Sequence, residues 1–264
     1  MNFDVLDQQM RVYEESLDQI LLPDLYLVAR LDGNRFTRLT KEVCNFEAPF
    51  DERFRDMMVR TVQALMNYGF RVIYGYTQSD EISLLFHPAE ETFGRKVRKY
   101  NSILAGVASA AFSLDLGKSA IFDCRMVPLP NVERVRDFFL WRQEDAHRNA
   151  LNAHCYWLLR KQGVGKQAAT AKLDGQSTAF KNELLFQNGI NFDKLPVWQK
   201  RGIGIYWAME EKQGYNPVTG QSVAALRRIM KTDYELPLKE EYANLVEKIL
   251  TDAEREKAKR GVGS

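Results

Sequence analysis

The chain is poor in cysteine and histidine, with three of each among 264 residues. Cys44, Cys124 and Cys155 are widely spaced and odd in number, which disfavours a disulfide framework and favours a reducing compartment. We therefore expect a cytoplasmic protein. Neither a Cys-x-x-Cys nor a His-x-x-x-His pair occurs, so a structural zinc site is not expected.

Long apolar runs and a strong charge imbalance are also missing. No segment approaches the ~18–20 apolar residues of a membrane span. The first residues lack the basic and apolar regions of a secretory signal. We expect neither a membrane partner nor export. Lys and Arg number 37 against 35 Asp and Glu, for a net charge of +2. Electrostatic recognition must therefore come from local clusters.

Helical and strand patterns alternate through the first half of the chain. Apolar residues at helical spacing predict helices, and short apolar runs bounded by turn residues predict strands. After a first helix, the order is β-α-β-β-α-β, which is typical of a ferredoxin-like domain. The expected helices are 3–22, 51–68 and 92–116, and the expected strands are 25–32, 70–76, 81–86 and 120–127.

The second half has a different organisation, and two prolines near residue 130 mark the change. Helices are expected at 131–160, where a break is allowed, at 164–173 and at 237–259, with a strand at 202–209. We therefore expect an α+β protein. A ferredoxin-like domain occupies residues 1–130, and a mixed, mainly helical C-terminal region occupies residues 131–264.

The ferredoxin-like order predicts a group of carboxylates at one edge of the sheet. In that order the first and third strands are adjacent and antiparallel, so the end of one lies beside the start of the other. Asp32 ends the first, and Asp80 and Glu81 begin the third. Clustered carboxylates raise one another's pKa unless a cation lies between them. Gly33 leaves room for a phosphate or metal to approach the backbone.

Oxygen ligands of this kind select Mg²⁺, usually with substrate phosphates completing the coordination shell. Two such ions stabilise the attacking and leaving oxygens of a phosphoryl or nucleotidyl transfer. The alternative is that Asp-Gly and Ser-Asp are ordinary turn dipeptides.

Basic residues cluster on both sides of the expected site. The segment 94–100 holds four basic residues and no acid, and Arg95 and Lys99 share a helix face with Lys96 nearby. We expect them to meet a triphosphate at the start of that helix. Basic residues in the loop after Asp32 can do the same from the other side; they are Arg35, Arg38 and Lys41. A solvated basic surface is the alternative.

Six sequence blocks resemble the tRNA(His) guanylyltransferase family. The blocks are residues 30–36, 74–83, 95–100, 122–125, 141–149 and 182–186. They cover most of residues 20–210 in the right order, so the resemblance is more specific than either acidic motif alone. It implies a polymerase-type palm in residues 1–130 that works in the reverse, 3′-to-5′ direction. The C-terminal region would serve nucleotide activation, tRNA contacts and oligomerisation.

The resemblance implies roles for individual residues. Asp32, the Gly33 carbonyl and Asp80 would bind two Mg²⁺ ions, and Glu81 would be a supporting catalytic carboxylate. The implied nucleotide-binding residues are Asp32, Gly33, Asn34, Arg35, Phe36, Thr37, Ser79, Asp80, Arg95, Lys96 and Lys99, with Lys99 on the triphosphate. Candidates for activation or tRNA contacts are Lys41, Arg142, His147, Arg148, Asn149, Lys200 and Arg201, for which solvated charge is the alternative. The implied substrates are tRNA, ATP and GTP, and the implied assembly is a homotetramer.

Departures from the family pattern favour one branch of it. Members that add guanosine to tRNA(His) carry a His-Ile-Asn-Asn-type segment, of which this chain keeps only His147 and Asn149. Thr37 stands where many members have His, and Asn34-Arg35 are in swapped order. We therefore expect the guanylyltransferase-like branch, which restores missing 5′ nucleotides of tRNA by pairing with the opposite strand.

Three alternatives stay open. One is an enzyme that adds a single guanosine to full-length tRNA(His). A second is a nucleotide cyclase with the same palm. The third is a non-catalytic RNA-binding protein, which would need exposed aromatic residues on the first and third strands.

Overall fold

The computed structural model describes the backbone of residues 2–215 and 222–261 and the side chains of residues 2–213 and 226–255. Its centre is a six-stranded antiparallel sheet in the order β4-β1-β3-β2-β5-β6. The strands are β1 (Tyr26–Asn34), β2 (Val72–Gln78), β3 (Glu81–Phe86), β4 (Ile121–Leu129), β5 (Ile203–Tyr215) and β6 (Ser222–Asp233). The predicted α+β class and the β-α-β-β-α-β order of the first half are confirmed.

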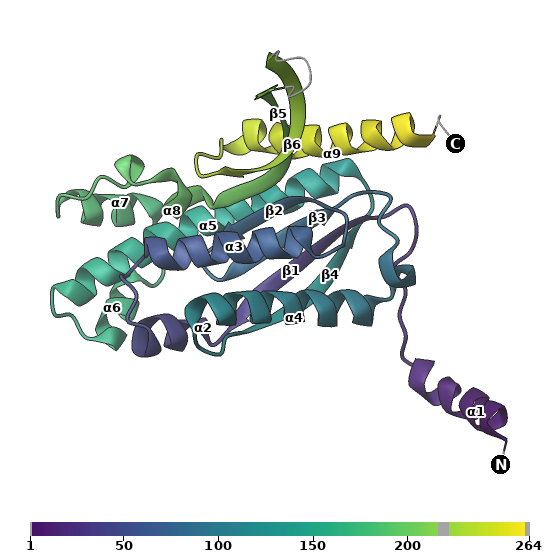
Figure 1. Ribbon diagram of the computed structural model, residues 1–264. Helices are drawn as coiled ribbons and strands as arrows, with labels where there is room; N and C mark the ends of the chain where they lie inside the picture. Colours follow the sequence, from purple (N-terminus) through teal and green to yellow (C-terminus); the bar gives the residue numbers. More distant parts are fainter. Residues whose placement is uncertain (1, 216–221, 262–264) are drawn as a thin grey trace.

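Two pairs of helices cover the two faces of the sheet. Helices α3 (Glu52–Asn67) and α4 (Val97–Leu116) lie on one face, and α5 (Val132–Lys161) lies on the other with α9 (Lys239–Gly261) beside it (Figure 1). Each face has its own buried cluster: Val62, Leu104 and Leu31 belong to the first, and Phe139, Val246 and Leu85 to the second. The sheet is therefore the middle layer of three.

The other helices and helical turns are shorter. Their bounds are α1 (Phe3–Glu15), α2 (Phe36–Arg38), a π-helical turn (Leu39–Val43), 3₁₀ turns (Thr92–Arg95 and Phe192–Lys194), α6 (Lys166–Leu173), α7 (Thr178–Phe186) and α8 (Val197–Arg201). Helices α6 and α7 pack on the C-terminal half of α5 around a third buried cluster that includes Leu151, Leu173 and Leu185. No helix within the described part of the chain is long and apolar enough to cross a membrane.

The ends of the main helices follow from capping chemistry. Asp51 precedes α3, and its carboxylate accepts from the Arg53 amide at 2.8 Å, which satisfies an N–H that the helix leaves free. Gly117 follows α4 with a φ of 69°, the left-handed conformation that ends many helices.

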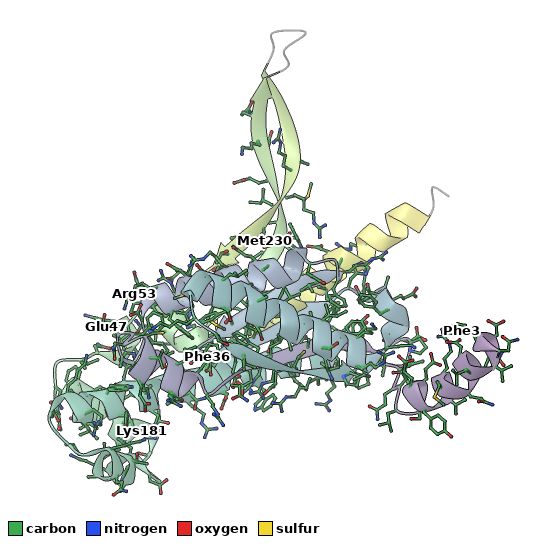
Figure 2. The ribbon with its side chains drawn as sticks, turned by 60° about the horizontal axis from the view of Figure 1, so that its bottom comes forward. Phe3, Phe36, Glu47, Arg53, Lys181 and Met230 are labelled. Atoms are coloured by element: carbon green, nitrogen blue, oxygen red, sulfur yellow. The ribbon has the colours of Figure 1, made fainter. Side chains whose placement is uncertain are left out.

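The first predicted helix is shorter than expected. It ends at Glu15 and not at residue 22, because residues 19–21 form backbone hydrogen bonds with the segment that leads into α4. Leu21 N donates to Arg95 O at 3.0 Å, and Val97 N donates to Gln19 O at 2.8 Å. The predicted helix 92–116 correspondingly begins at Val97. Helix α1 stands apart from the body, with the Phe3 side chain at its far end (Figure 2).

The second half contains elements that the sequence pattern did not predict. Helix α7 and strand β6 were not expected, and β5 is longer than the predicted strand at 202–209. Strands β5 and β6 form a long hairpin that projects from the body (Figure 2). Helix α5 runs without the break that was allowed for. Because β5 pairs with β2, the sheet contains strands from both sides of the predicted boundary at residue 130.

Candidate active site

Strands β1 and β3 bring the predicted carboxylates together. In their antiparallel register Asp32 lies opposite Glu81, and Gly33 N donates to Asp80 O at 3.1 Å. On the other side of β1, Asp32 lies opposite Asp123 of β4. The acidic residues therefore meet at one edge of the sheet, as the topology predicts.

Gly33 is packed too tightly for any side chain. A Cβ atom there would lie 2.5 Å from the Phe36 ring and 2.9 Å from the Asp80 Cβ. The Phe36 ring is buried, with its centroid 4.9 Å from that of Phe122 and 5.2 Å from that of Phe112. This aromatic cluster holds the loop after β1 against the turn that carries Asp80.

Two turn residues next to the carboxylates have left-handed backbone conformations. Arg35 has a φ of 59° and Ser79 a φ of 54°. A residue with a Cβ adopts this conformation at a cost of about 1 kcal/mol or more, and such residues concentrate at functional sites. Asn34, Arg35 and Thr37 are exposed, so the predicted nucleotide loop presents its polar side chains to solvent at this edge.

The carboxyl group of Asp80 resists ionisation. Burial raises its pKa to about 6, and the nearby charges of Asp32 and Glu81 add to the rise. The Ser79 hydroxyl donates to Asp80 Oδ1 at 3.1 Å, which opposes the shift. A cation that replaces the proton would therefore strongly stabilise the ionised carboxylate of Asp80.

Glu81 has different partners. Its Oε1 lies 2.7 Å from Arg30 Nη2, and its Oε2 lies 3.3 Å from Arg142 Nη1. Arg142 also pairs with Asp145 at 2.6 Å. The charge of Glu81 is thus neutralised by two arginines. Through them Glu81 links β3 to β1 and to α5, which makes it a structural support of the acidic edge.

With Glu81 paired to arginines, the groups at this edge that are left for a cation include Asp32, Asp80 and the Gly33 carbonyl. In the part of the chain that the structure describes, no three acidic, histidine or cysteine side chains are grouped closely enough to hold a metal ion. The arginines at this edge pair with Glu81 and leave Asp32 and Asp80 as acceptors. Two carboxylates and a backbone carbonyl are oxygen ligands of the chemical kind that Mg²⁺ takes when substrate phosphates supply the rest of its shell.

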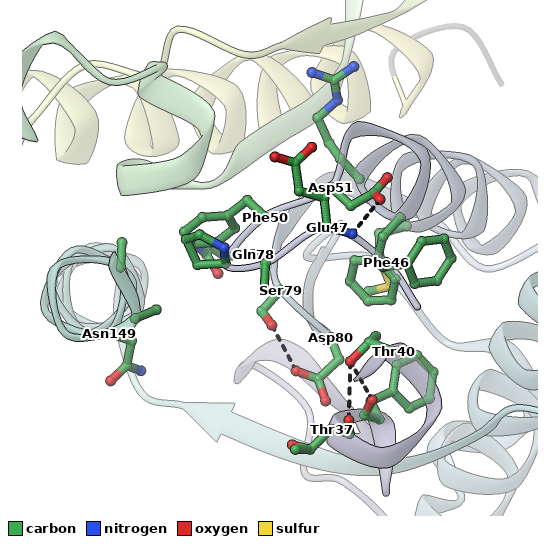
Figure 3. A pocket seen from close by; sticks show the side chains of 18 of the residues that line it. Thr37, Thr40, Phe46, Glu47, Phe50, Asp51, Gln78, Ser79, Asp80 and Asn149 are labelled. Atoms are coloured by element: carbon green, nitrogen blue, oxygen red, sulfur yellow. Dashed lines mark hydrogen bonds between the residues drawn. The ribbon is translucent and has the colours of Figure 1, made fainter. Parts of the chain in front are cut away.

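A pocket leads from the acidic edge toward the C-terminal region (Figure 3). Its described lining includes Thr37, Ser79 and Asp80 beside the carboxylates, and also Phe50, Asn149, Trp157 and Trp198. The pocket therefore combines polar side chains with aromatic ones, a lining that suits a small-molecule ligand such as a nucleotide.

Lys41 lines the same pocket. Its Nζ lies 4.8 Å from the centre of the Trp157 ring and 5.9 Å from that of Tyr156. Burial lowers the pKa of Lys41, and the charge of Lys166 lowers it further. A bound anionic ligand would therefore stabilise the charged form of Lys41.

The structure does not bring the predicted basic helix start to this edge. Arg95 is buried and donates to the carbonyls of Leu21 and Leu22, in the segment before β1. Lys96 pairs with Asp18 at 2.8 Å. Lys99 Nζ lies 5.9 Å from the centre of the Phe93 ring. Strand β1 has nine residues, so the two ends are roughly 30 Å apart. The reason is that β3 carries the chain away from Asp80 before α4 begins.

The predicted C-terminal candidates divide into two groups. Asn149 lines the pocket, His147 is half-buried against the Phe192 ring at 5.3 Å, and Arg148 is exposed. Burial lowers the pKa of His147. Lys200 and Arg201 instead support the fold, because each donates to a backbone carbonyl, that of Asp193 at 2.6 Å and that of Leu236 at 2.9 Å. Arg38 is exposed and lies 3.6 Å from Glu42.

Sequence reasoning overlooked some residues of this region. Asp123 lies in a block that carries the family resemblance, but only the register across β1 shows that it faces Asp32. The aromatic residues Phe50, Trp157 and Trp198 come from three separate segments. Their spacing carries no signal, because only tertiary contacts bring them to one pocket.

A palm-type antiparallel sheet, with carboxylates at its edge and a pocket beside them, is the arrangement of enzymes that transfer nucleotidyl groups. The family model described as tRNAHis guanylyltransferase matches residues 7–130, and the model described as Thg1 C terminal domain matches residues 133–259. The chain therefore belongs to the tRNA(His) guanylyltransferase family, as its sequence blocks predict.

Individual relatives agree with this assignment. A probable tRNA(His) guanylyltransferase of Drosophila melanogaster is 34% identical over 70% of this chain and 68% of its own length. A tRNA(His) guanylyltransferase of Candida glabrata is 31% identical over 69% of this chain and 82% of its own.

Solved structures extend the similarity to nearly the whole chain. A bacterial tRNA(His) guanylyltransferase-like protein in complex with GTP has a TM-score of 0.70 at 27% identity, covering 93% of this chain and 99% of that one. The ATP complex of such a protein has a TM-score of 0.74 at 26% identity, covering 92% and 98%.

Proposed function

We propose that this chain is a Mg²⁺-dependent 3′-to-5′ nucleotidyltransferase that restores missing 5′ nucleotides of tRNA, templated by the opposite strand. The observation that carries the proposal is that Asp80 belongs to both the acidic edge and the pocket. A nucleotide in the pocket and a triphosphate at the edge would share one carboxylate. This suits a reaction that uses nucleotides in two successive roles.

The two roles follow from the chemistry. An oxygen of the tRNA 5′ phosphate attacks the α-phosphorus of ATP or GTP, and pyrophosphate leaves. The 3′-hydroxyl of an incoming nucleoside triphosphate then attacks the activated 5′ phosphate, its proton passes to solvent, and the nucleoside monophosphate leaves. Bound Mg²⁺ would stabilise the charge that develops on the reacting oxygens. Asp32, Asp80 and the Gly33 carbonyl would hold it, while Lys41 would attract the phosphates of the activating nucleotide.

One sequence feature supports repair over addition of a single guanosine. Residues 147–152 keep only His147 and Asn149 of the segment expected in guanosine-adding members.

Extension of truncated tRNA tests the proposal. The protein is incubated with Mg²⁺, ATP, all four nucleoside triphosphates and tRNAs that lack one 5′ nucleotide. These tRNAs carry each of the four bases at the opposite position. We expect the added nucleotide to follow that base, the Asp80→Ala variant to be inactive and the Asp137→Ala control to be active, because Asp137 pairs with Arg134 on exposed α5 surface. Failure of wild-type protein to extend these tRNAs would refute the proposal.

A variant of Lys41 separates the two steps. With ATP labelled in its α-phosphate, transfer of the label to the tRNA 5′ end reports activation alone. We expect Lys41→Met to slow this transfer by roughly 10- to 100-fold, the range for loss of a charged contact. A tRNA that is already adenylylated should be extended by the variant at the wild-type rate. Equal loss on both substrates would contradict the role of Lys41.

The addition of one guanosine to full-length tRNA(His) is the second candidate, because the fly and yeast relatives carry that name. Assays of intact and truncated tRNA(His) side by side distinguish the two reactions. A binding-only role finds no support, because Phe86 of β3 is fully buried and Tyr26 of β1 is half-buried. A cyclase would release a cyclic product without RNA in the same assay.

Assembly as a homotetramer stays a prediction. Helix α1 leaves large apolar side chains exposed, among them Phe3, Met10 and Tyr13, and such residues commonly cover another subunit. Light scattering of the protein in solution measures its mass directly.

A further inference from the structure

Trp141 is unusually exposed for a tryptophan, at 55% of its surface. Tryptophan side chains are highly buried on average, and an exposed one suggests a contact that the isolated chain lacks. Its ring lies over the Arg142 guanidinium, whose carbon is 4.0 Å from the ring centre, and the Arg30 guanidinium carbon is 6.0 Å away. The Phe138 ring packs against it edge-on at 6.0 Å.

The arginines beneath Trp141 are themselves fixed. Each bonds a different oxygen of the Glu81 carboxylate, and Arg142 also donates to Asp145 at 2.6 Å. Only 3% of the Arg142 side chain is exposed. The indole thus lies on two arginines that are fixed by their ion pairs, while much of its surface faces solvent.

This exposed ring lies close to the acidic edge. Glu81, which binds both arginines, is directly opposite Asp32 in the sheet. Paired residues on adjacent strands have Cβ atoms about 5 Å apart, which places the ring on the order of 10 Å from the Asp32 carboxylate. Two residues before Asp32, and on the same face of β1, Arg30 pairs with Arg125 of β4. The exposed Arg125 therefore adds a positive charge near the ring.

We propose that Trp141 stacks the 5′-terminal nucleobase of the RNA whose 5′ phosphate reacts. This inference rests on the proposed function. It would locate the 5′ end of the RNA next to the edge that carries Asp32. Stacking uses the flat face that every base possesses, so it holds a strand without reading its sequence. An enzyme that restores whichever nucleotide the opposite strand specifies needs such a contact. Arg125 is placed to attract the adjacent phosphate.

The alternative role for Trp141 is an apolar cover over the arginines and Glu81. Two substitutions distinguish the roles. Trp141→Leu keeps an apolar cover but removes the flat aromatic face, whereas Trp141→Phe keeps the face. Tyr68→Ala is the matched control, because Tyr68 is also 55% exposed and follows α3 at the end of the sheet away from Asp32.

Binding is measured without nucleotides, so that turnover cannot occur, using a truncated tRNA with 2-aminopurine as its 5′-terminal base. Stacking on indole quenches this fluorophore. We expect Trp141→Ala and Trp141→Leu to weaken binding by roughly 5- to 100-fold and to abolish the quenching. Trp141→Phe should bind within about threefold of wild type. The KM for ATP in the activation step should be unchanged in all variants, and Tyr68→Ala should match wild type.

Opposite results would overturn the inference. Wild-type binding and quenching by Trp141→Leu would show that Trp141 is only a cover. An equal rise in the KM for ATP would show that the substitution disturbs the edge itself. In either case the proposed function stands if wild-type protein extends truncated tRNA. If wild-type protein neither binds nor extends that tRNA, the proposed function and the inference both fail.

Discussion

The amide of Gly33 donates a hydrogen bond to the carbonyl oxygen of Asp80 at 3.1 Å, which joins the end of β1 to the turn before β3. The approach is so close that a Cβ on Gly33 would lie 2.9 Å from the Asp80 Cβ and 2.5 Å from the Phe36 ring. The two chain segments that carry Asp32 and Asp80 are therefore in register only because residue 33 has no side chain.

Substitution of Gly33 by alanine should damage both activity and stability. The Phe36 ring cannot yield easily because it is packed among other aromatic rings, so the Asp80 turn must shift. A shift of about 1 Å at reacting groups lowers rates by about 100-fold, and overpacking costs about 1–3 kcal/mol. The tRNA extension rate and the denaturant midpoint measure the two effects.

Gly106→Ala is the matched control. Gly106 lies inside α4, and a Cβ there would meet nothing within 4 Å. Alanine at this position should raise the free energy of unfolding by up to about 1 kcal/mol, because glycine is the poorer helix former. Normal activity in Gly33→Ala would show that the close approach is not needed for catalysis.

Asp80→Asn should abolish activity and stabilise the protein when no metal is bound. The pKa of Asp80 is about 6 in the folded chain, against 3.8 normally. A raised carboxyl pKa means that folded-state stability falls as pH rises from about 4 to 6, and the penalty persists above pH 6. Removing the charge should therefore gain about 1–3 kcal/mol at pH 7, after allowance for partial exposure.

Thermal unfolding in the presence of a chelator, at pH 4 and pH 7, measures this gain. It should be present at pH 7 and small at pH 4. Added Mg²⁺ should raise the Tm of wild-type protein and not that of Asp80→Asn, because binding to the folded state is stabilising. Destabilisation by Asp80→Asn at pH 7 would mean that the carboxylate has an unrecognised cationic partner.

Glu81→Gln should have the opposite effect on stability, although Glu81 is the next residue. Its carboxylate binds Arg30 and Arg142 and is 32% exposed. Loss of the charge leaves the buried Arg142 guanidinium with Asp145 alone, at an expected cost of about 1–3 kcal/mol. Chemical denaturation at pH 7 compares the two variants. If Glu81→Gln were stabilising like Asp80→Asn, Glu81 would belong with the metal-binding carboxylates.

The positions of Asp80 and Glu81 can be predicted from the sequence, but their different roles cannot. Strand order and antiparallel pairing follow from hydrophobic periodicity, so the meeting of Asp32 with Asp80 and Glu81 was predictable. The division of roles was not, because it depends on the position of Arg142, which reaches Glu81 from α5. Likewise, a basic cluster in the sequence does not show that Arg95 is buried against backbone carbonyls.

The unpredicted elements have equally physical reasons. Strand β6 contains Ala, Leu, Arg and Met, which are good helix formers, and it is a strand because β5 pairs with it. The first helix is shorter than its amphipathic pattern because residues 19–21 bond to the segment before α4. In both cases a tertiary partner overrides local propensity.

Because Asp51 caps α3, the free energy of unfolding should fall at acidic pH. The Asp51 carboxylate binds the Arg53 side chain and the amides of Glu47 and Arg53, which lowers its pKa to about 2 from 3.8. A lowered pKa gives stability that is present above pH 4 and lost as pH falls toward 2. Because Arg53 is 67% exposed, the contribution is about 1–2 kcal/mol.

Asp51→Asn tests this, since asparagine is also a good cap and loses mainly the charge. It should lower the free energy of unfolding by about 1–2 kcal/mol at pH 7, and the difference from wild type should vanish near pH 2. Ser177→Ala is the control, because Ser177 caps α7 through a hydroxyl that does not titrate in this range. Its cost, about 1 kcal/mol, should be the same at every pH. A pH-independent effect of Asp51→Asn would mean that the cap stabilises α3 by geometry, with no contribution from charge.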